Sequence, residues 1–278
     1  MRVPPPPRGL IITADDFGLH EAINEAVEQA HRHGVLTAAS LMVGAPASAD
    51  AVKRARRLPT LRVGLHLVLA DGVAVLSPDA IPDLVDAAGR FGDRMVRDGA
   101  RFFLLPRVRR QLAAEIAAQF AAFRATGLEL DHVNAHKHFH LHPTVLALLL
   151  AIGREFGLRA VRWPAAPKPP LPLQPWLWLM ARRLDRARML HNDRVYGIES
   201  SGAMDETALL AVLERLPGGL SEIYLHPASR CGITASMANY RHTDELAALL
   251  SPRVRAALDR LGVRRGGYRD FQPEWRGP

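Results

Sequence analysis

Short apolar runs alternate with longer stretches of helical periodicity along most of this chain. Strand-like runs are expected over residues 9–14, 36–43, 62–69, 130–135, 160–163 and 222–224. Apolar residues recur at helical spacing over residues 21–31, 47–58, 107–126 and 144–156. Repeated alternation of strand and helix favours a parallel sheet with helices outside it.

Two α/β architectures share this alternation, the open doubly wound sheet and the (β/α) barrel. A dinucleotide-binding sheet carries a glycine-rich loop after its first strand, whereas this chain has Asp15-Asp16-Phe17-Gly18 there. We therefore expect an α/β fold of the (β/α) barrel-like type, a distorted TIM-type barrel, formed by a single domain over residues 1–278. A proline-rich segment with tryptophans and arginines, at about 164–200, is expected to be an insertion.

Composition narrows the classes of function. The chain has 278 residues, of which 48% are hydrophobic and 23% charged, and its net charge is +8. Its basic residues are scattered arginines rather than a cluster interleaved with aromatic residues, so no nucleic-acid partner is expected. The single cysteine, Cys231, excludes an internal disulfide framework and a cysteine-based zinc site. Neither a signal-peptide pattern nor a membrane-spanning run is present, so we expect a cytoplasmic location.

Two adjacent carboxylates, Asp15 and Asp16, stand at the end of the first predicted strand. In parallel α/β folds, reactive residues gather at the carboxyl ends of the strands. Two neighbouring carboxylates are costly to desolvate unless a cation compensates them. Successive strand residues point to opposite sides, so each aspartate can serve a different role. The alternative interpretation is a pair of aspartates that caps a helix beginning near Leu19.

Five of the 12 histidines lie at even positions between residues 132 and 142. In an extended chain this spacing places His136 and His138 on one face, where both can meet one metal ion. A low-complexity histidine tract is the alternative, although it fits poorly beside a strand. His66, inside the apolar run 62–69, and His226, after the strand at 222–224, either belong to the same site or are buried structural histidines.

Together these features predict a site of carboxylates and imidazoles with no thiol and no serine nucleophile. Two neutral histidines and one aspartate leave coordination positions open for water, as in a catalytic zinc site. A metal in such a site lowers the pKa of its water to about 7 and polarises a carbonyl group. The predicted chemistry is hydrolysis of an amide or ester. Zinc suits the donor set best, and Mg²⁺, Mn²⁺ or Co²⁺ are alternatives.

The same motifs resemble the YdjC/ChbG-like carbohydrate deacetylases. The resemblance is carried by residues 13–18 (TADDFG), 64–66 (GLH), 136–140 (HKHFH) and 225–227 (LHP), and it covers essentially the whole chain. The segments 192–197 and 200–202 are most similar to the branch associated with hopanoid biosynthesis, HpnK. The family resemblance implies a (β/α)-barrel-like fold and removal of an acetyl group from an N-acetylated amino sugar.

The resemblance also implies roles for individual residues. The metal ligands would be Asp16, His66 and His136, the catalytic base Asp15 and the catalytic acid His226. Three further residues are candidates for contact with the substrate: His138, His140 and Arg162. For Arg162, whose guanidinium can bond sugar hydroxyls, a surface salt bridge is the alternative.

One departure from the family pattern concerns the metal site. Family members commonly have Asp-Ser before the first histidine of the run, where this chain has Asn134-Ala135. Asn134 keeps an acceptor oxygen but loses the charge, so its support of a metal-bound histidine is expected to be weaker.

The hopanoid resemblance implies a membrane-resident substrate, an N-acetylglucosaminyl hopanoid. Residues 171–190 combine tryptophans, leucines and arginines, which suits peripheral contact with the inner face of an anionic membrane. An amphipathic helix packed on the barrel is the alternative for this segment. Other functions left open are deacetylation of soluble chitooligosaccharides, a metal-dependent amidohydrolase or phosphoesterase, and a non-catalytic metal- or sugar-binding module.

Overall fold

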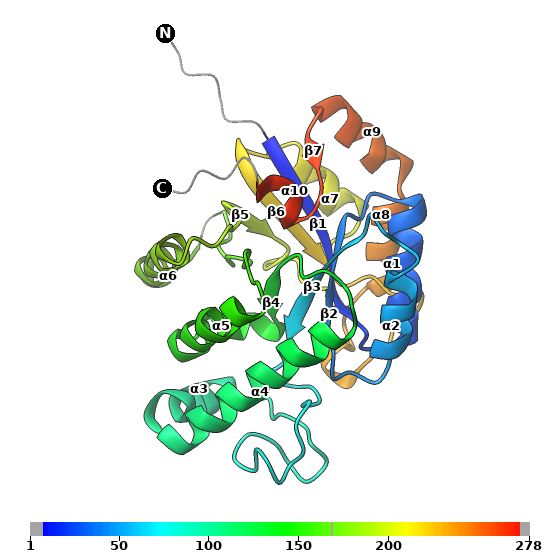
Figure 1. Ribbon diagram of the computed structural model, residues 1–278. Helices are drawn as coiled ribbons and strands as arrows, with labels where there is room; N and C mark the ends of the chain where they lie inside the picture. The colour runs from blue at the N-terminus through cyan, green and yellow to red at the C-terminus, as the bar shows by residue number, and fades with distance from the viewer. Residues whose placement is uncertain (1–7, 168, 273–278) are drawn as a thin grey trace.

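A curled parallel sheet forms the centre of the molecule (Figure 1). The computed structural model describes residues 8–167 and 169–272, so both ends of the predicted domain 1–278 lie outside the described residues. The strands are β1 (Arg8–Phe17), β2 (Ala38–Leu41), β3 (Arg62–Leu67), β4 (Val133–Ala135), β5 (Arg194–Tyr196), β6 (Gly219–Leu225) and β7 (Arg264–Arg265). Their order is β4-β3-β2-β1-β6-β5, and β7 pairs with the beginning of β1.

The two edges of the sheet, β4 and β5, approach each other through the extended segment 160–165. Val133 of β4 donates to the carbonyl of Ala160 at 3.0 Å and accepts from the backbone of Arg162 at 3.0 Å. On the other side, Val195 of β5 donates to the carbonyl of Ala165 at 2.9 Å. The predicted strand 160–163 therefore forms only isolated bridges, yet it curls the sheet towards closure. The expected α/β barrel-like fold is confirmed.

Helices surround the sheet, with α1, α2 and α8 along one side and α3 to α6 along the other (Figure 1). Their bounds are α1 (Glu21–His33), α2 (Ser48–Ala55), α3 (Met95–Leu104), α4 (Pro106–Ala125), α5 (Pro143–Glu155), α6 (Gln174–Arg186), α7 (Glu206–Leu213), α8 (His242–Leu250), α9 (Pro252–Leu261) and α10 (Tyr268–Phe271). Short 3₁₀ turns are η1 (His136–Leu141), η2 (Leu171–Leu173) and η3 (Ala235–Met237).

Apolar periodicity explains how the helices pack on the sheet. In α1, the apolar residues that recur at helical spacing are buried: Ala22, Ile23, Ala26, Val27 and Ala30. The long helix predicted over 107–126 is α4, displaced by one residue. The segment 164–200, expected as an insertion, contains α6 but also β5, whose Val195 pairs with Glu222 of β6. The last part of that segment therefore belongs to the sheet.

Candidate metal centre and active site

Three side chains meet where β1, β3 and β4 end. Asp16 comes from β1, His66 from β3 and His136 from the residue after β4, and one donor atom of each lies within 4.8 Å of the others. The Oδ1 atom of Asp16 is 3.2 Å from Nε2 of His66 and 3.1 Å from Nδ1 of His136. All three are buried. The structure thus brings together the three residues predicted as metal ligands.

A bulge in β1 allows adjacent aspartates to reach this end of the sheet. The pairing of β1 with β2 shifts register between Ala14 and Phe17, and Asp16 has a φ of 62°. Aspartate tolerates this left-handed conformation better than most residues, and a bulge re-aims the side chain that it carries. The alternative that the aspartates cap α1 is wrong, because the cap is His20, whose Nδ1 accepts from the backbone of Ala22 at 2.9 Å.

The donor chemistry of the triad fits a divalent metal. Burial alone would raise the pKa of Asp16, but the facing imidazoles of His136 and His66 hold its pKa well below the ordinary value, so the carboxylate is ionised. Its second oxygen, Oδ2, is buried and has no hydrogen-bond partner within the described residues. A buried, ionised carboxylate with a free oxygen beside two imidazoles is a donor set typical of divalent transition metals.

The amide of Asn134 orients one of these ligands. Its Oδ1 accepts from Nδ1 of His66 at 2.7 Å, which leaves Nε2 of that histidine facing Asp16. Its Nδ2 donates to Oδ1 of Asp15 at 3.1 Å and to Oγ of Ser40 at 3.0 Å. The support of a metal histidine expected from Asn134 is therefore present, and the same side chain also contacts the predicted base.

His132 supports the Ser40 side chain that Asn134 contacts. Its ring lies between Asp131, 2.8 Å from Nδ1, and Ser40, 3.0 Å from Nε2. Gly64 of β3 makes room for it, because a Cβ atom there would lie 2.5 Å from the imidazole. The glycine of the motif at 64–66 thus permits the packing that positions Ser40 and, through it, Asn134.

Arg162 joins two buried carboxylates. Its Nη1 and Nη2 donate to Oδ2 and Oδ1 of Asp15 at 2.6 and 2.9 Å, and its Nε and Nη2 donate to Glu222 at 2.9 and 2.8 Å. The side chain is fully buried. The predicted contact of Arg162 with sugar hydroxyls is therefore wrong, and so is the alternative of a surface salt bridge.

The charge of Arg162 determines the ionisation of its partners. Burial alone would raise the pKa of Asp15, but the guanidinium, with a smaller contribution from His66, holds that pKa far below the ordinary value. The pKa of Glu222 is lowered in the same way. Sequence reasoning missed Glu222, although a lone carboxylate in a strand followed by apolar residues, as in β6, signals a buried cationic partner.

The second and third histidines of the 136–140 run do not follow the predicted extended geometry. Lys137 and His138 have left-handed φ values of 54° and 53°, so the expectation that His136 and His138 share one strand face is wrong. The Nε2 of His138 instead lies 3.1 Å from the hydroxyl of Tyr224. His140 is fully buried, with Nε2 donating to the carbonyl of Arg162 at 2.9 Å, so its predicted contact with substrate is also wrong.

A hollow of about 200 Å³ opens over the triad. Its lining includes the predicted base and acid, both histidines of the triad, a further histidine and two tyrosines: Asp15, His66, His136, His138, Tyr224, His226 and Tyr240. The backbone of His226 is fixed on both sides, since its N–H donates to Glu245 at 2.5 Å and its carbonyl accepts from His242 at 2.6 Å. Its Nδ1 is buried and lacks a hydrogen-bond partner in the described part of the chain.

Comparison with known proteins finds relatives over most of the chain. The model of the YdjC-like protein family matches residues 9–260. The chain belongs to the YdjC-like family. It is 32% identical to the carbohydrate deacetylase of Brevibacillus brevis over 249 residues, which cover 88% of this chain and 92% of the relative. It is 31% identical to the chitooligosaccharide deacetylase of Klebsiella pneumoniae subsp. pneumoniae, with coverage of 95% and 99%.

The fold agrees with that of a solved relative of this YdjC-like chain. A crystal structure from Enterococcus faecalis V583 is 25% identical and superimposes with a TM-score of 0.78, covering 95% of this chain and 99% of the other. The predicted family resemblance is therefore confirmed along nearly the whole length of the chain.

Proposed function

We propose that this YdjC-like protein is a metal-dependent hydrolase that removes the acetyl group from an N-acetylated amino sugar. The observation that carries the proposal is the Asp16–His66–His136 triad, which lies at a hollow lined also by Asp15 and His226. The names of the relatives, carbohydrate and chitooligosaccharide deacetylases, support the same reaction class. One divalent ion, with zinc the best match to the donor set, would bind the triad.

Asp15 is proposed as the base that accepts a proton from the attacking water. A bound metal would supply polarisation of the acetamide carbonyl and a lowered pKa for that water. Asp15 is ionised and held in one orientation by Arg162 and Asn134. An ionised carboxylate fixed at the edge of the hollow can accept a proton without first losing one.

His226 is proposed as the acid. Cleavage of the C–N bond leaves a nitrogen that must be protonated to depart as an amine. The ring of His226, whose Nε2 lies 3.9 Å from Oδ2 of Asp16, can carry that proton. Backbone bonds to Glu245 and His242 hold the residue at the hollow. His138, which also lines the hollow, is proposed to contact the sugar.

For the acceptor we propose an N-acetylglucosaminyl hopanoid lipid. Two features support it: the resemblance of residues 192–197 and 200–202 to the hopanoid-associated branch, and the apolar and basic character of residues 171–190. That segment contains α6, and Trp176 donates from Nε1 to the carbonyl of Leu141 at 2.9 Å, so α6 contacts η1, the turn that begins at His136. Soluble chitooligosaccharides are the second candidate, favoured by the name of the Klebsiella relative.

Acetate release from both substrates, with and without a chelator, tests the proposal. Chelator-sensitive release from the hopanoid alone is the expected result. Release from the soluble sugar alone would keep the deacetylase and discard the lipid acceptor. Release from neither, by protein shown to contain metal, would overturn the proposed reaction.

A further inference from the structure

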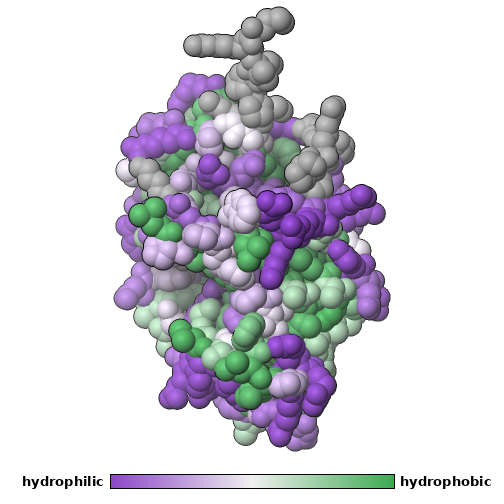
Figure 2. Space-filling view, turned by 90° about the vertical axis from the view of Figure 1, so that its left-hand side faces the viewer, coloured by the Kyte–Doolittle hydropathy of each residue, from purple (hydrophilic) through white to green (hydrophobic). Residues whose placement is uncertain are grey.

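The exposed apolar side chains gather on one face. Within residues 8–167 and 169–272, six large hydrophobic residues are strongly exposed, and all belong to α3 and the turn after it or to η2 and α6: Val96, Phe103, Leu104, Leu105, Leu171 and Trp178. Figure 2 shows this side of the molecule, with hydrophobic patches lying between hydrophilic ones. Single exposed apolar residues are ordinary on protein surfaces, but a set confined to two helices on one side indicates an interaction surface.

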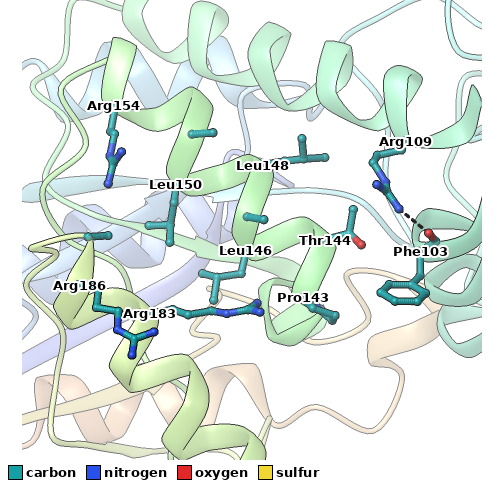
Figure 3. A pocket seen from close by; sticks show the side chains of 13 residues that line it. Phe103, Arg109, Pro143, Thr144, Leu146, Leu148, Leu150, Arg154, Arg183 and Arg186 are labelled. Atoms are coloured by element: carbon teal, nitrogen blue, oxygen red, sulfur yellow. Dashed lines mark hydrogen bonds between the residues drawn. The ribbon is translucent and has the colours of Figure 1, made fainter. Parts of the chain in front are cut away.

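A groove runs between these two helices along α5. It has a volume of about 710 Å³ and is lined along α5 by the leucines Leu146, Leu148 and Leu150. Phe103 stands on one side of these leucines and Arg183 and Arg186 on the other (Figure 3). The groove is thus apolar along its floor and basic along the α6 wall.

Three arginines that line the groove have no acidic partner among the described residues. Arg154, Arg183 and Arg186 form no ion pair with a carboxylate in the described part of the chain. The one acidic residue of α6, Asp185, is engaged by His191 at 3.0 Å. Arg182 instead lies over the ring of Trp178, with 4.8 Å between its guanidinium carbon and the ring centroid. The groove therefore carries uncompensated positive charge beside exposed apolar groups, whereas Arg97 and Arg101 of α3 pair with Asp98.

We propose that the face formed by α3, α6 and the α5 groove, the docking face, binds the surface of an anionic phospholipid bilayer. Phe103, Leu104 and Trp178 would enter the interfacial region, as aromatic and aliphatic side chains do in peripheral proteins. Arg183 and Arg186 would contact the lipid headgroups, whose negative charge attracts basic residues close to the surface. Binding is peripheral, since no helix among the described residues is long and apolar enough to cross a membrane.

An anionic bilayer fits this face better than a protein partner. The buried centre of a protein–protein interface is depleted of charged residues, whereas here the guanidinium groups line the groove itself. The docking face also adjoins the candidate site, because α6 contacts η1 through Trp176 and Leu141. Docking requires no turnover, so this inference stands apart from the proposed function.

Vesicle flotation of the full chain tests the inference. We expect binding to vesicles of phosphatidylglycerol and phosphatidylcholine, little binding to phosphatidylcholine alone, and weaker binding at high salt because surface charges are screened. The double variant Phe103→Ser/Leu104→Ser should lose binding. Arg186→Glu changes two charge units and should weaken binding about tenfold or more.

Arg260→Glu is the matched control, because Arg260 is also an exposed arginine in the last turn of a helix, α9, away from the docking face (Figure 1). It should float like the unmodified protein. Thermal unfolding and circular dichroism verify that each variant is folded. Equal binding by Arg186→Glu and Arg260→Glu, or no flotation of the unmodified protein with anionic vesicles, would overturn the proposal. So would a dimer, detected by sedimentation, that Phe103→Ser/Leu104→Ser dissociates while vesicle binding is absent.

Discussion

The side-chain amide of Asn134 donates a hydrogen bond to the carboxylate of Asp15 across 3.1 Å. The same amide accepts from Nδ1 of His66 through its oxygen. Only a group with both a donor and an acceptor can make these two contacts, because the carboxylate of Asp15 accepts and the ring N–H donates. The residue that departs from the common family pattern therefore links the predicted base to a predicted metal ligand.

Substitutions of Asn134 should separate its two contacts. Asn134→Ala removes both, and we expect metal affinity to fall by about 10–100-fold, the usual effect of losing a partner that orients a metal-binding histidine. Asn134→Asp keeps an acceptor for His66 but places a second carboxylate against Asp15, so metal should be retained while kcat falls. Metal titration and acetate release measure the two effects. Unchanged metal affinity in Asn134→Ala would contradict the orienting role.

Removing the base should stop turnover without removing the metal. We expect Asp15→Asn to lower kcat by about 10²–10⁴-fold, the usual contribution of general base catalysis. Metal content should stay close to that of the unmodified protein, since Asp15 is not part of the triad. His136→Ala, in contrast, should lose the metal.

Glu222→Gln is the matched control for Asp15→Asn, since both residues pair with Arg162 but Glu222 does not line the hollow. Both variants disrupt a buried ion pair and should lower the free energy of unfolding by up to about 3–5 kcal/mol. Only Asp15→Asn should show the large loss of kcat at a temperature where both are folded. Similar rates for the two variants would remove Asp15 from the base role.

The role of His226 should depend on the leaving group. His226→Gln is expected to lower hydrolysis of an N-acetylated sugar by about 10²–10⁴-fold, because the departing nitrogen must be protonated. Hydrolysis of p-nitrophenyl acetate, whose leaving group departs as a stable anion, should change far less. The ratio of the two rates is the measurement, and an equal decrease for both substrates would show that His226 does not act as the acid.

Stability should depend on pH through Glu222. Burial would raise its pKa, but the charge of Arg162 outweighs burial and lowers the pKa below its ordinary value of 4.5. The unfolded chain therefore binds the proton more readily, and this contribution to stability is complete above pH 4.5 and is lost as the pH falls through the lower folded-state value. Denaturant unfolding should be measured above and below pH 4.5. The free energy of unfolding should fall less on acidification for Glu222→Gln than for the unmodified protein.

The sequence predicts the elements that carry local signals. Apolar runs locate β1 to β4, and motif resemblance locates Asp16, His66 and His136 at the ends of three of them. These predictions succeed because parallel strands bring their carboxyl ends to the same edge of the sheet. Helix periodicity is equally informative for α1 and α4, whose buried faces are long.

What remains unpredicted depends on contacts between distant segments. Arg162 and Glu222 are 60 positions apart, and neither residue alone shows that the other is its partner. The left-handed turn at Lys137 and His138 contains no glycine, so the sequence gives no turn signal there and the alternating histidines resemble the pattern of a strand. Of the surface that we propose to bind a membrane, the sequence indicates only residues 171–190, since α3 lies far from them in sequence.

The bulge in β1 has a consequence for how this site can vary. Because Asp15 and Asp16 are joined by one peptide unit, the distance between the Cα atoms of the proposed base and of the metal-binding aspartate is fixed by covalent geometry. Helices can shift and loops can lengthen around the sheet while the backbone of this pair moves as one body. Substrate preference can therefore diverge among related proteins while the backbone positions of these two aspartates, relative to each other, stay the same.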